Sequence, residues 1–266
     1  MSAATYEQTI DLSGTAPLPF GRLVRVELRK MADTRAGRWL LISIAALTAL
    51  VLVIQLSVVL VQDLTVEFRD FMVAMNTPMG VLLPVLGVMC VTSEWSQRTA
   101  MVTFTLEPSR MKLVGAKFVA TMLIAVAAVV VGMALSVAAN LLYGALSGND
   151  AIWGFGASDV FYVFLLHAFG MATGFAFGTL FLNTPAGIVV YFVYSFVLPP
   201  LFALGAALMS WFKDLQPWID FADAQNPLVD GTIAGKEWAH LAVSGLIWLV
   251  LPLALGLWRV LRAEVK

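Results

Sequence analysis

Six stretches of the sequence are long and apolar enough to cross a lipid bilayer, which limits the possible folds more than any other feature. An α-helix rises about 1.5 Å per residue, so about 20 apolar residues span the hydrocarbon core. Only 12% of the residues are charged, whereas soluble domains have about 25%. We therefore expect an all-α integral membrane protein with six transmembrane helices. The predicted spans are residues 39–62, 71–92, 113–146, 158–183, 185–211 and 238–258.

The third apolar run is too long for one straight span. We expect this helix to project beyond the membrane at one end or to bend. The whole transmembrane domain would cover residues 39–258.

Basic residues are distributed unevenly among the connections. Of the 16 Lys and Arg residues, 13 lie before the first span, within residues 93–117, or after the last span. Positive charge marks the cytoplasmic side of a membrane protein. Both termini, including the C-terminal segment 259–266, and the strip 93–112 are therefore predicted to be cytoplasmic, in the cell membrane of a bacterium.

The connection of residues 212–237 falls on the outer side in this topology. It is longer than a connector requires, and acidic residues crowd it. Aromatic and apolar side chains within it indicate a short segment at the level of the lipid headgroups. These side chains are Phe212, Trp218, Ile219 and Phe221.

Residues 1–19 are a polar stretch that we expect to be mobile, and residues 20–38 have the pattern of an amphipathic helix. Such a helix lies in the membrane interface and contacts lipids. The alternative is a soluble helix beside the membrane, whose basic residues only reflect the excess of positive charge on the cytoplasmic side. The apolar face would be Phe20, Leu23, Val24, Leu28 and Met31, and the basic face Arg22, Arg25 and Arg29.

Glycines recur at four-residue spacing in the fourth span. Gly170, Gly174 and Gly178 lie on one helix face, where the absence of side chains lets another backbone come close. The pattern predicts a packing face, either within the protomer or between protomers.

Prolines interrupt two of the predicted spans. Pro78 and Pro84 lie in the second span, and Pro199 and Pro200 lie in the fifth. Proline lacks an N–H donor, so we expect both helices to be broken or kinked. Breaks of this kind are tolerated where they line a cavity or a gate, although a static kink is the alternative.

Motifs for chemistry are missing from the sequence. There is no GxxxxGK[ST] phosphate loop, no HExxH and no GxSxG. The single cysteine, Cys90, has no partner for a disulfide or a metal site. We expect no metal, no cofactor and no ATP hydrolysis in this chain. The net charge of −1 argues against a nucleic-acid partner.

Two histidines remain as candidates for an intramembrane enzyme. His240 lies one helical turn before Ser244, and His167 lies inside the fourth span. An ionisable side chain within a span is a functional candidate by default. However, neither histidine belongs to a recognisable catalytic cluster, so an enzyme is disfavoured.

The strip TSEWSQRTAMVTFTLEPSRMKLVGAK, residues 92–117, is polar and lies between two apolar runs. Its pattern is an acid, a basic residue with Thr, a hydrophobic turn, Pro-x-Arg, and a Lys that enters the next span. The strip is either a solvated loop or a surface that a partner grips. The residues of the pattern are Glu94, Arg98, Thr99, Pro108, Arg110 and Lys117.

This strip, together with the basic helix before it and the six spans, resembles the type-2 ABC export permease family. The resemblance implies that the helix 20–38 and the strip 93–112 dock onto a separate cytosolic ATPase subunit, which binds ATP and Mg. It also implies a second copy of the permease, or a related permease, in the complex. The coupling residues would be Arg22, Arg25, Arg29, Glu94, Arg98, Thr99, Met101, Phe104, Pro108 and Arg110.

The resemblance predicts the permease subunit of an exporter. The spans carry almost no charge, so a hydrophobic or amphipathic substrate is expected. The alternative is a membrane anchor or an immunity-type assembly subunit that transports nothing.

Overall fold

The computed structural model describes residues 18–97 and 99–263 and is built from helices. Residues 1–17 of the predicted tail lie outside the described residues, as do Arg98 and residues 264–266. The elements are α1 (Phe20–Asp33), α2 (Arg35–Val61), α3 (Phe68–Ser96), α4 (Ala100–Leu106), α5 (Arg110–Ser147), α6 (Ala157–Phe181), α7 (Thr184–Phe192), η1 (Val193–Val197), α8 (Leu198–Leu208), α9 (Ser210–Ile219), η2 (Asp223–Gln225), α10 (Asn226–Val229), α11 (Lys236–Gly245), η3 (Leu246–Val250) and α12 (Leu251–Arg262).

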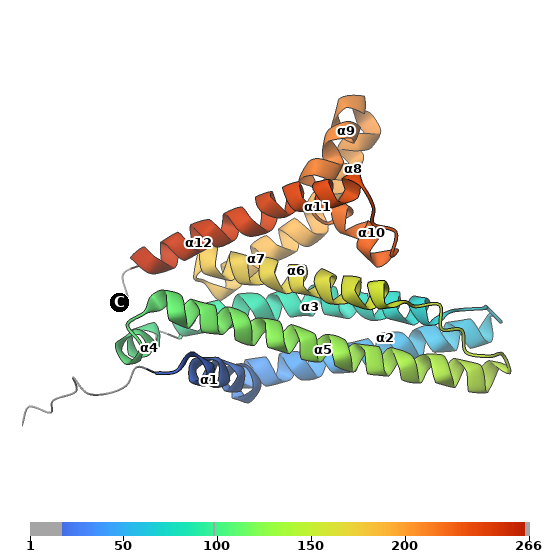
Figure 1. The fold of residues 1–266 in the computed structure, drawn as a ribbon, viewed down its shortest axis with the longest axis horizontal. Coiled ribbons are helices and arrows are strands. Elements are labelled where there is room, and N and C mark those ends of the chain that lie inside the picture. The colour runs from blue at the N-terminus through green and yellow to red at the C-terminus, as the bar shows by residue number, and fades with distance from the viewer. Residues whose placement is uncertain (1–17, 98, 264–266) are drawn as a thin grey trace, which may run out of the picture.

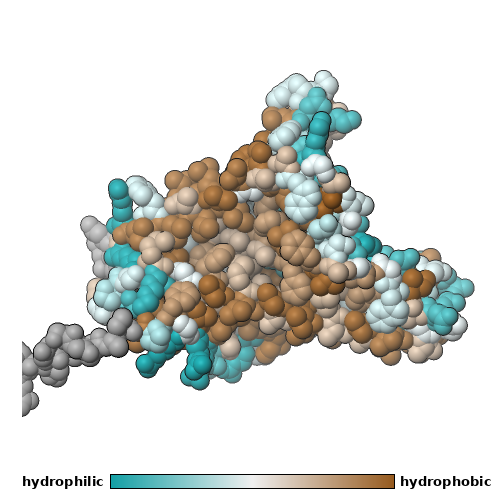
Figure 2. All heavy atoms as spheres, in the orientation of Figure 1, coloured by the Kyte–Doolittle hydropathy of each residue, from teal (hydrophilic) through white to brown (hydrophobic). Residues whose placement is uncertain are grey.

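Six of the helical segments are long and apolar enough to span a membrane, which confirms the predicted fold class. Four are the single helices α2, α3, α5 and α6, and two are the composites Thr184–Leu208 and Lys236–Arg262. The surface is apolar over the middle of the bundle and hydrophilic at its extremities (Figure 2). The chain is therefore a multi-pass membrane protein. We call the end that holds α1, α4 and the last turn of α12 the basic end (Figure 1).

The prediction of one helix over residues 20–38 is wrong, because the chain turns at Thr34. The side chain of Thr34 accepts a hydrogen bond from the N–H of Gly37 and so caps the start of α2. A Cβ on Gly37 would collide with the carbonyl of Met31, so only glycine allows this fold-back. The first span consequently begins at Arg35.

The third predicted span is one unbroken helix, α5, of 38 residues. Its length is about 57 Å at 1.5 Å per residue, well beyond the thickness of a hydrocarbon core. A helix of this length exceeds the core, so the expectation that it projects beyond the membrane stays a prediction.

The predicted glycine face of α6 packs within the protomer, against α3. A Cβ on Gly174 would overlap the carbonyl of Pro84, and one on Gly178 would lie 2.9 Å from the carbonyl of Val88. The contact is reciprocal, since a Cβ on Gly87 of α3 would lie 2.6 Å from the carbonyl of Met171. Gly170 is less crowded, with the Pro84 ring 3.4 Å from an added Cβ.

Of the two outcomes expected at Pro78 and Pro84, a break or a kink, the break is wrong, because α3 is continuous through both prolines. Pro84 has no N–H to bond the carbonyl of Gly80, one turn earlier. The hydroxyl of Tyr191, from α7, donates to that carbonyl at 2.8 Å. A neighbouring helix thus replaces the missing donor.

The predicted irregularity at Pro199 and Pro200 takes the form of a π turn. Because the two prolines cannot donate, the helix widens just before them: η1 precedes α8, and the N–H of Leu198 bonds to the carbonyl of Val193. The sixth span contains an equivalent π turn, η3, just before Pro252, which the sequence analysis did not predict.

The long connection at the opposite end folds into α9, η2 and α10 (Figure 1). Of the aromatic side chains expected at the headgroup level, Trp218 is partly exposed on α9. Phe221, in contrast, is buried and packs edge-on against Phe169 of α6. Phe221 therefore anchors the connection to the bundle, and the headgroup level expected for this segment stays a prediction.

Candidate functional site

The amphipathic helix α1 lies against the first turns of α5 at the basic end. Its buried residues Leu23 and Val24 pack on Ala116 and Ala120. The small alanines let the two helices approach closely, which brings polar side chains of α1 over the ends of α3 and α5.

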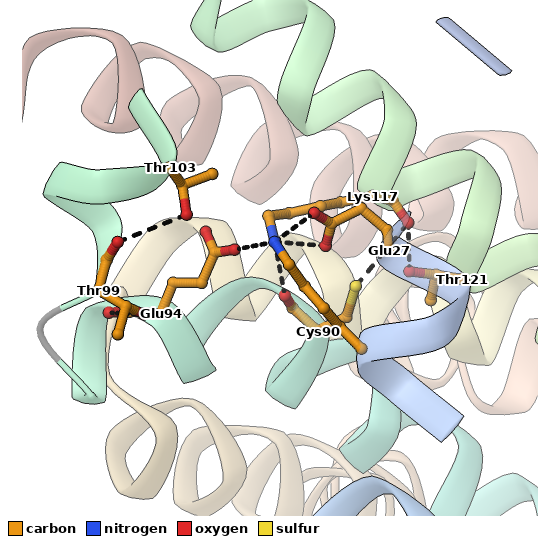
Figure 3. A network of polar contacts seen from close by, with 8 residues as sticks. Glu27, Cys90, Glu94, Thr99, Thr103, Lys117 and Thr121 are labelled. Atoms are coloured by element: carbon orange, nitrogen blue, oxygen red, sulfur yellow. Dashed lines mark hydrogen bonds and ion pairs between the residues drawn. The ribbon is translucent and has the colours of Figure 1, made fainter. Parts of the chain in front are cut away.

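Charged side chains from α1, α3 and α5 meet at this junction, and Figure 3 shows Glu27, Glu94 and Lys117 among them. The ammonium of Lys117 lies 2.7 Å from Glu27 and 3.1 Å from Glu94. The ammonium of Lys30 lies 2.8 Å from Glu27 and 2.6 Å from Glu94. Each carboxylate thus faces two cations, and the charges balance. We call these residues the ion network.

The ion network is largely out of water. The Lys117 and Glu27 side chains are only 5% and 3% exposed, whereas that of Lys30 is 40% exposed. Lys117 also donates to the carbonyl of Cys90 at 3.5 Å. Removing one partner from such a buried network leaves an uncompensated charge, which costs about 3–5 kcal/mol. The network therefore holds α1, α3 and α5 together as one unit.

Glu94 does not lie where the sequence analysis expected it. The resemblance implied a coupling residue that contacts the ATPase, but the Glu94 side chain is only 9% exposed and faces Lys30 and Lys117. The sequence analysis missed Glu27 entirely, and it did not predict the pairing of Lys117. A signal was present, because Glu27 interrupts the apolar face of α1 between Val24 and Met31.

Arg110 also turns inward instead of toward a partner. Its guanidinium donates to the carbonyls of Val260 and Ala263, both at 2.8 Å, and to that of Leu261 at 3.3 Å. These carbonyls belong to the end of α12, where helix carbonyls lack partners from their own helix. Arg110 therefore caps α12, and its predicted role in docking is not supported by its position.

The short helix α4 projects apolar side chains at the basic end. Met101 and Val102 are 51% and 60% exposed. Phe104 is only half-buried, against Trp95 and beneath the guanidinium of Arg110. Met101 and Val102 are thus available to a partner, while Phe104 mainly supports α4.

The other predicted coupling residues are spread over the surface of the basic end. Thr99, at the start of α4, and Pro108, after its end, are exposed. Arg98 lies outside the described residues. The three arginines of the basic face are exposed on α1, opposite its buried side: Arg22, Arg25 and Arg29.

A cleft of about 690 Å³ adjoins the ion network. It lies between the turn from α1 to α2 on one side and the end of α3 with α4 on the other. Lys30 and Glu94 line it together with Arg35 and Val102. The cleft thus links the network to the exposed surface of α4.

Neither histidine candidate for an enzyme is paired with a nucleophile among the residues that the structure describes. The hydroxyl of Ser244 donates to the backbone carbonyl of His240 at 2.7 Å, while the His240 ring packs edge-on against Trp218. His167 is buried among α3, α6 and η1. Among the described residues, no group of three or more His, Cys, Asp or Glu could hold a metal ion. The expected absence of a cofactor stays a prediction.

No protein-family model matches the chain, and no curated protein sequence matches it.

Proposed function

We propose that this chain is the permease subunit of an ABC exporter in a bacterial cell membrane, with both termini in the cytosol. A separate cytosolic ATPase subunit, carrying ATP and Mg, would drive it. A second copy of the chain, or a related permease, would complete the complex. The proposal rests on the buried ion network together with the exposed helix beside it.

The ion network supports a mechanical role for the basic end. Glu27 and Lys30 come from α1, Glu94 from α3 and Lys117 from α5. A force applied to α1 would pass to α3 and α5, because separating these three helices would leave buried charges unpaired. ATP-driven movement of an attached ATPase is a suitable source of such a force.

The surface of α4 supports docking of a protein. Met101 and Val102 lie at the basic end, which the distribution of Lys and Arg assigns to the cytosol. Two adjacent apolar side chains on a helix of seven residues fit a hydrophobic groove on a partner. The basic face of α1 would contact anionic lipid or the ATPase beside it.

The spans support a substrate that is hydrophobic or amphipathic. The described charges concentrate at the ends of the spans, and the lipid-facing parts of the last two spans are almost wholly apolar. A strongly charged substrate would need counter-charges along its route.

The test is a mild-detergent co-purification from the native host. The tagged protein is compared with the double variant Met101→Asp/Val102→Asp and with the control Leu64→Asp, an equally apolar, exposed residue in the connection between α2 and α3. We expect a stoichiometric subunit with a phosphate-binding loop, and ATPase activity, for the wild type and the control only.

Variants in the ion network are less suitable for this test, because Glu94 is buried and its replacement would disturb the fold. If the wild-type protein purifies alone under conditions that preserve other transporters, the permease proposal is wrong. A partner without ATPase activity would favour the alternative, a membrane anchor or immunity-type assembly subunit.

A further inference from the structure

A groove of about 370 Å³ lies between α2 and α5 on the side of the bundle. Small residues leave this hollow, such as Ala45 of α2 and Ala127 of α5, and the buried Met79 of α3 lies at its floor. Ala45, Ala127 and Val131 are exposed, so the groove is open at the surface. Among the described lining residues only Thr48 is polar, and it is buried. The groove therefore accepts hydrocarbon.

The groove has the length of one leaflet of a bilayer. It follows α5 from Ile124 to Leu135, which is about 16 Å at 1.5 Å per residue. The hydrocarbon core of a bilayer is about 30 Å thick, so this length is about half of the core. The volume lies in the range of about 300–1,000 Å³ that is usual for ligand sites. Both quantities suit a single acyl chain.

The helix α1 covers one end of the groove. It runs alongside α5 in the same direction: at its start, the Phe20 ring would lie 3.8 Å from a Cβ on Gly115. Two turns later, Leu28 lines the groove together with Ile124. The groove therefore begins under the second half of α1, and the start of α1 lies farther toward the basic end.

Two arginines of α1 flank this end of the groove. Arg25 precedes Leu28 by three positions, and Arg29 precedes Ala32 by three, and both Leu28 and Ala32 line the groove. Residues three apart share a helix face. Side chains on a helix lean toward its N-terminus, which here is the basic end. Both arginines are exposed, and neither forms an ion pair with another described residue.

The charge beside the groove selects the headgroup. Hydrophilic side chains gather over α1, next to the apolar surface of the bundle (Figure 2). The exposed side of α1 carries Arg22, Arg25 and Arg29 against one acid, Asp33. The cytoplasmic leaflet contains anionic lipids, and basic sites between helices on that side bind their headgroups. A free phosphate has no chain for the groove, and a choline lipid adds a cation beside the arginines.

We propose that this groove binds one acyl chain of an anionic phospholipid, whose phosphate accepts hydrogen bonds from Arg25 and Arg29. The lipid contacts α1, α2 and α5 together. It thus adds a membrane-dependent link to the unit that the ion network holds. The site requires only that the chain spans a membrane, so it does not depend on whether the chain is a permease.

The test is native mass spectrometry of the full chain, purified in a mild detergent and stripped of lipid. Phosphatidylglycerol and phosphatidylcholine with the same acyl chains are added separately, and the dissociation constant of the first bound lipid is measured. We expect phosphatidylglycerol to bind at least about tenfold more tightly, because each arginine near an anionic headgroup contributes about fivefold. Equal affinities for the two lipids would overturn the proposal.

A double variant tests the headgroup contact. Arg25→Gln/Arg29→Gln should weaken the binding of phosphatidylglycerol about tenfold or more and leave that of phosphatidylcholine unchanged. The control is Arg259→Gln/Arg262→Gln, which removes two exposed charges of α12 at the same end of the molecule. Equal losses in the two double variants would mean that only the overall charge attracts the lipid, and the site would be refuted.

A second pair of variants tests the groove itself. Ala45→Trp fills it and should abolish the binding of the first phosphatidylglycerol. Ala46→Trp is the control, because Ala46 is also exposed but does not line the groove. Wild-type affinity in both variants would contradict the proposal. A lipid-free dimer that Ala45→Trp abolishes would also overturn it, since the groove would then hold a second copy. If Ala45→Trp does not fold, the comparison of the two lipids still decides.

Discussion

At the scale of single residues, the ion network is the feature that we expect to contribute most to the stability of the fold. Lys117 is the central member, since it is nearly buried and contacts both carboxylates. Lys30 contributes less, because its side chain is 40% exposed and its charge is partly screened by water.

Lys117→Met should lower the stability of the protein strongly. Glu27 and Glu94 would remain buried with Lys30 alone, at a cost of about 3–5 kcal/mol. Thermal unfolding in detergent measures the loss. The control is Lys112→Met on the same helix. The ion pair between Lys112 and Glu107 is partly exposed, so its loss should lower the free energy of unfolding by less than about 1 kcal/mol.

The double variant Glu27→Gln/Lys117→Met removes one charge of each sign. Its loss of stability should be smaller than the sum of the two single losses, as expected for directly paired charges. Additive losses would mean that the two side chains do not interact.

Asp220 gives a prediction about pH. It lies outside the spans and is buried, and its carboxylate accepts hydrogen bonds from the N–H groups of Ala222 and Asp223. Burial raises the pKa of Asp220 above its ordinary value of 3.8. Folding therefore favours the protonated form. Its contribution to stability is full below pH 3.8 and is lost as the pH rises through the raised pKa.

Asp220→Asn should be at least as stable as the wild type at pH 7 and should lose this part of the pH dependence. The amide oxygen can still accept the two backbone bonds. Unfolding curves at several pH values measure both effects. The control is Asp230→Asn, because Asp230 is exposed. A marked loss of stability at pH 7 would show that the ionised form is needed.

At the scale of elements, the contact between α3 and α6 organises the bundle. Gly174 and Gly178 bring the two backbones together, and Tyr191 completes the hydrogen bonding of α3 at its proline. The glycine face was predictable because it depends on spacing within one helix. The continuity of α3 was not, because the donor that replaces the proline N–H comes from a residue more than 100 positions away.

Gly174→Ala should separate α3 from α6 and cost about 1–3 kcal/mol, because its Cβ would meet a backbone carbonyl that cannot move aside. Gly170→Ala on the same face should be nearly neutral, since its Cβ would make an ordinary contact with the Pro84 ring. Thermal unfolding of both variants measures the difference. Equal stabilities would contradict the close packing at Gly174.

At the scale of the whole molecule, hydropathy predicted the six spans because each one depends on local composition. The candidate site was only partly predictable. The exposed positions of Met101 and Val102 agree with the prediction, but Glu94 and Arg110 face the interior. A charged residue in a polar strip is predicted to be exposed unless its partners are known. The partner Lys30 of Glu94 and the end of α12, which Arg110 caps, both lie far away in the sequence.

The central claim, that α4 is the surface gripped by an ATPase, is tested most directly by photocrosslinking in native cells. A photoreactive amino acid replaces Met101 or Val102, and Leu64 at the opposite end serves as control; all three are exposed. We predict a crosslink to a protein with a phosphate-binding loop from residues 101 and 102 and none from residue 64. Crosslinks only to lipid from all three positions, or to the same proteins from all three, would contradict the account.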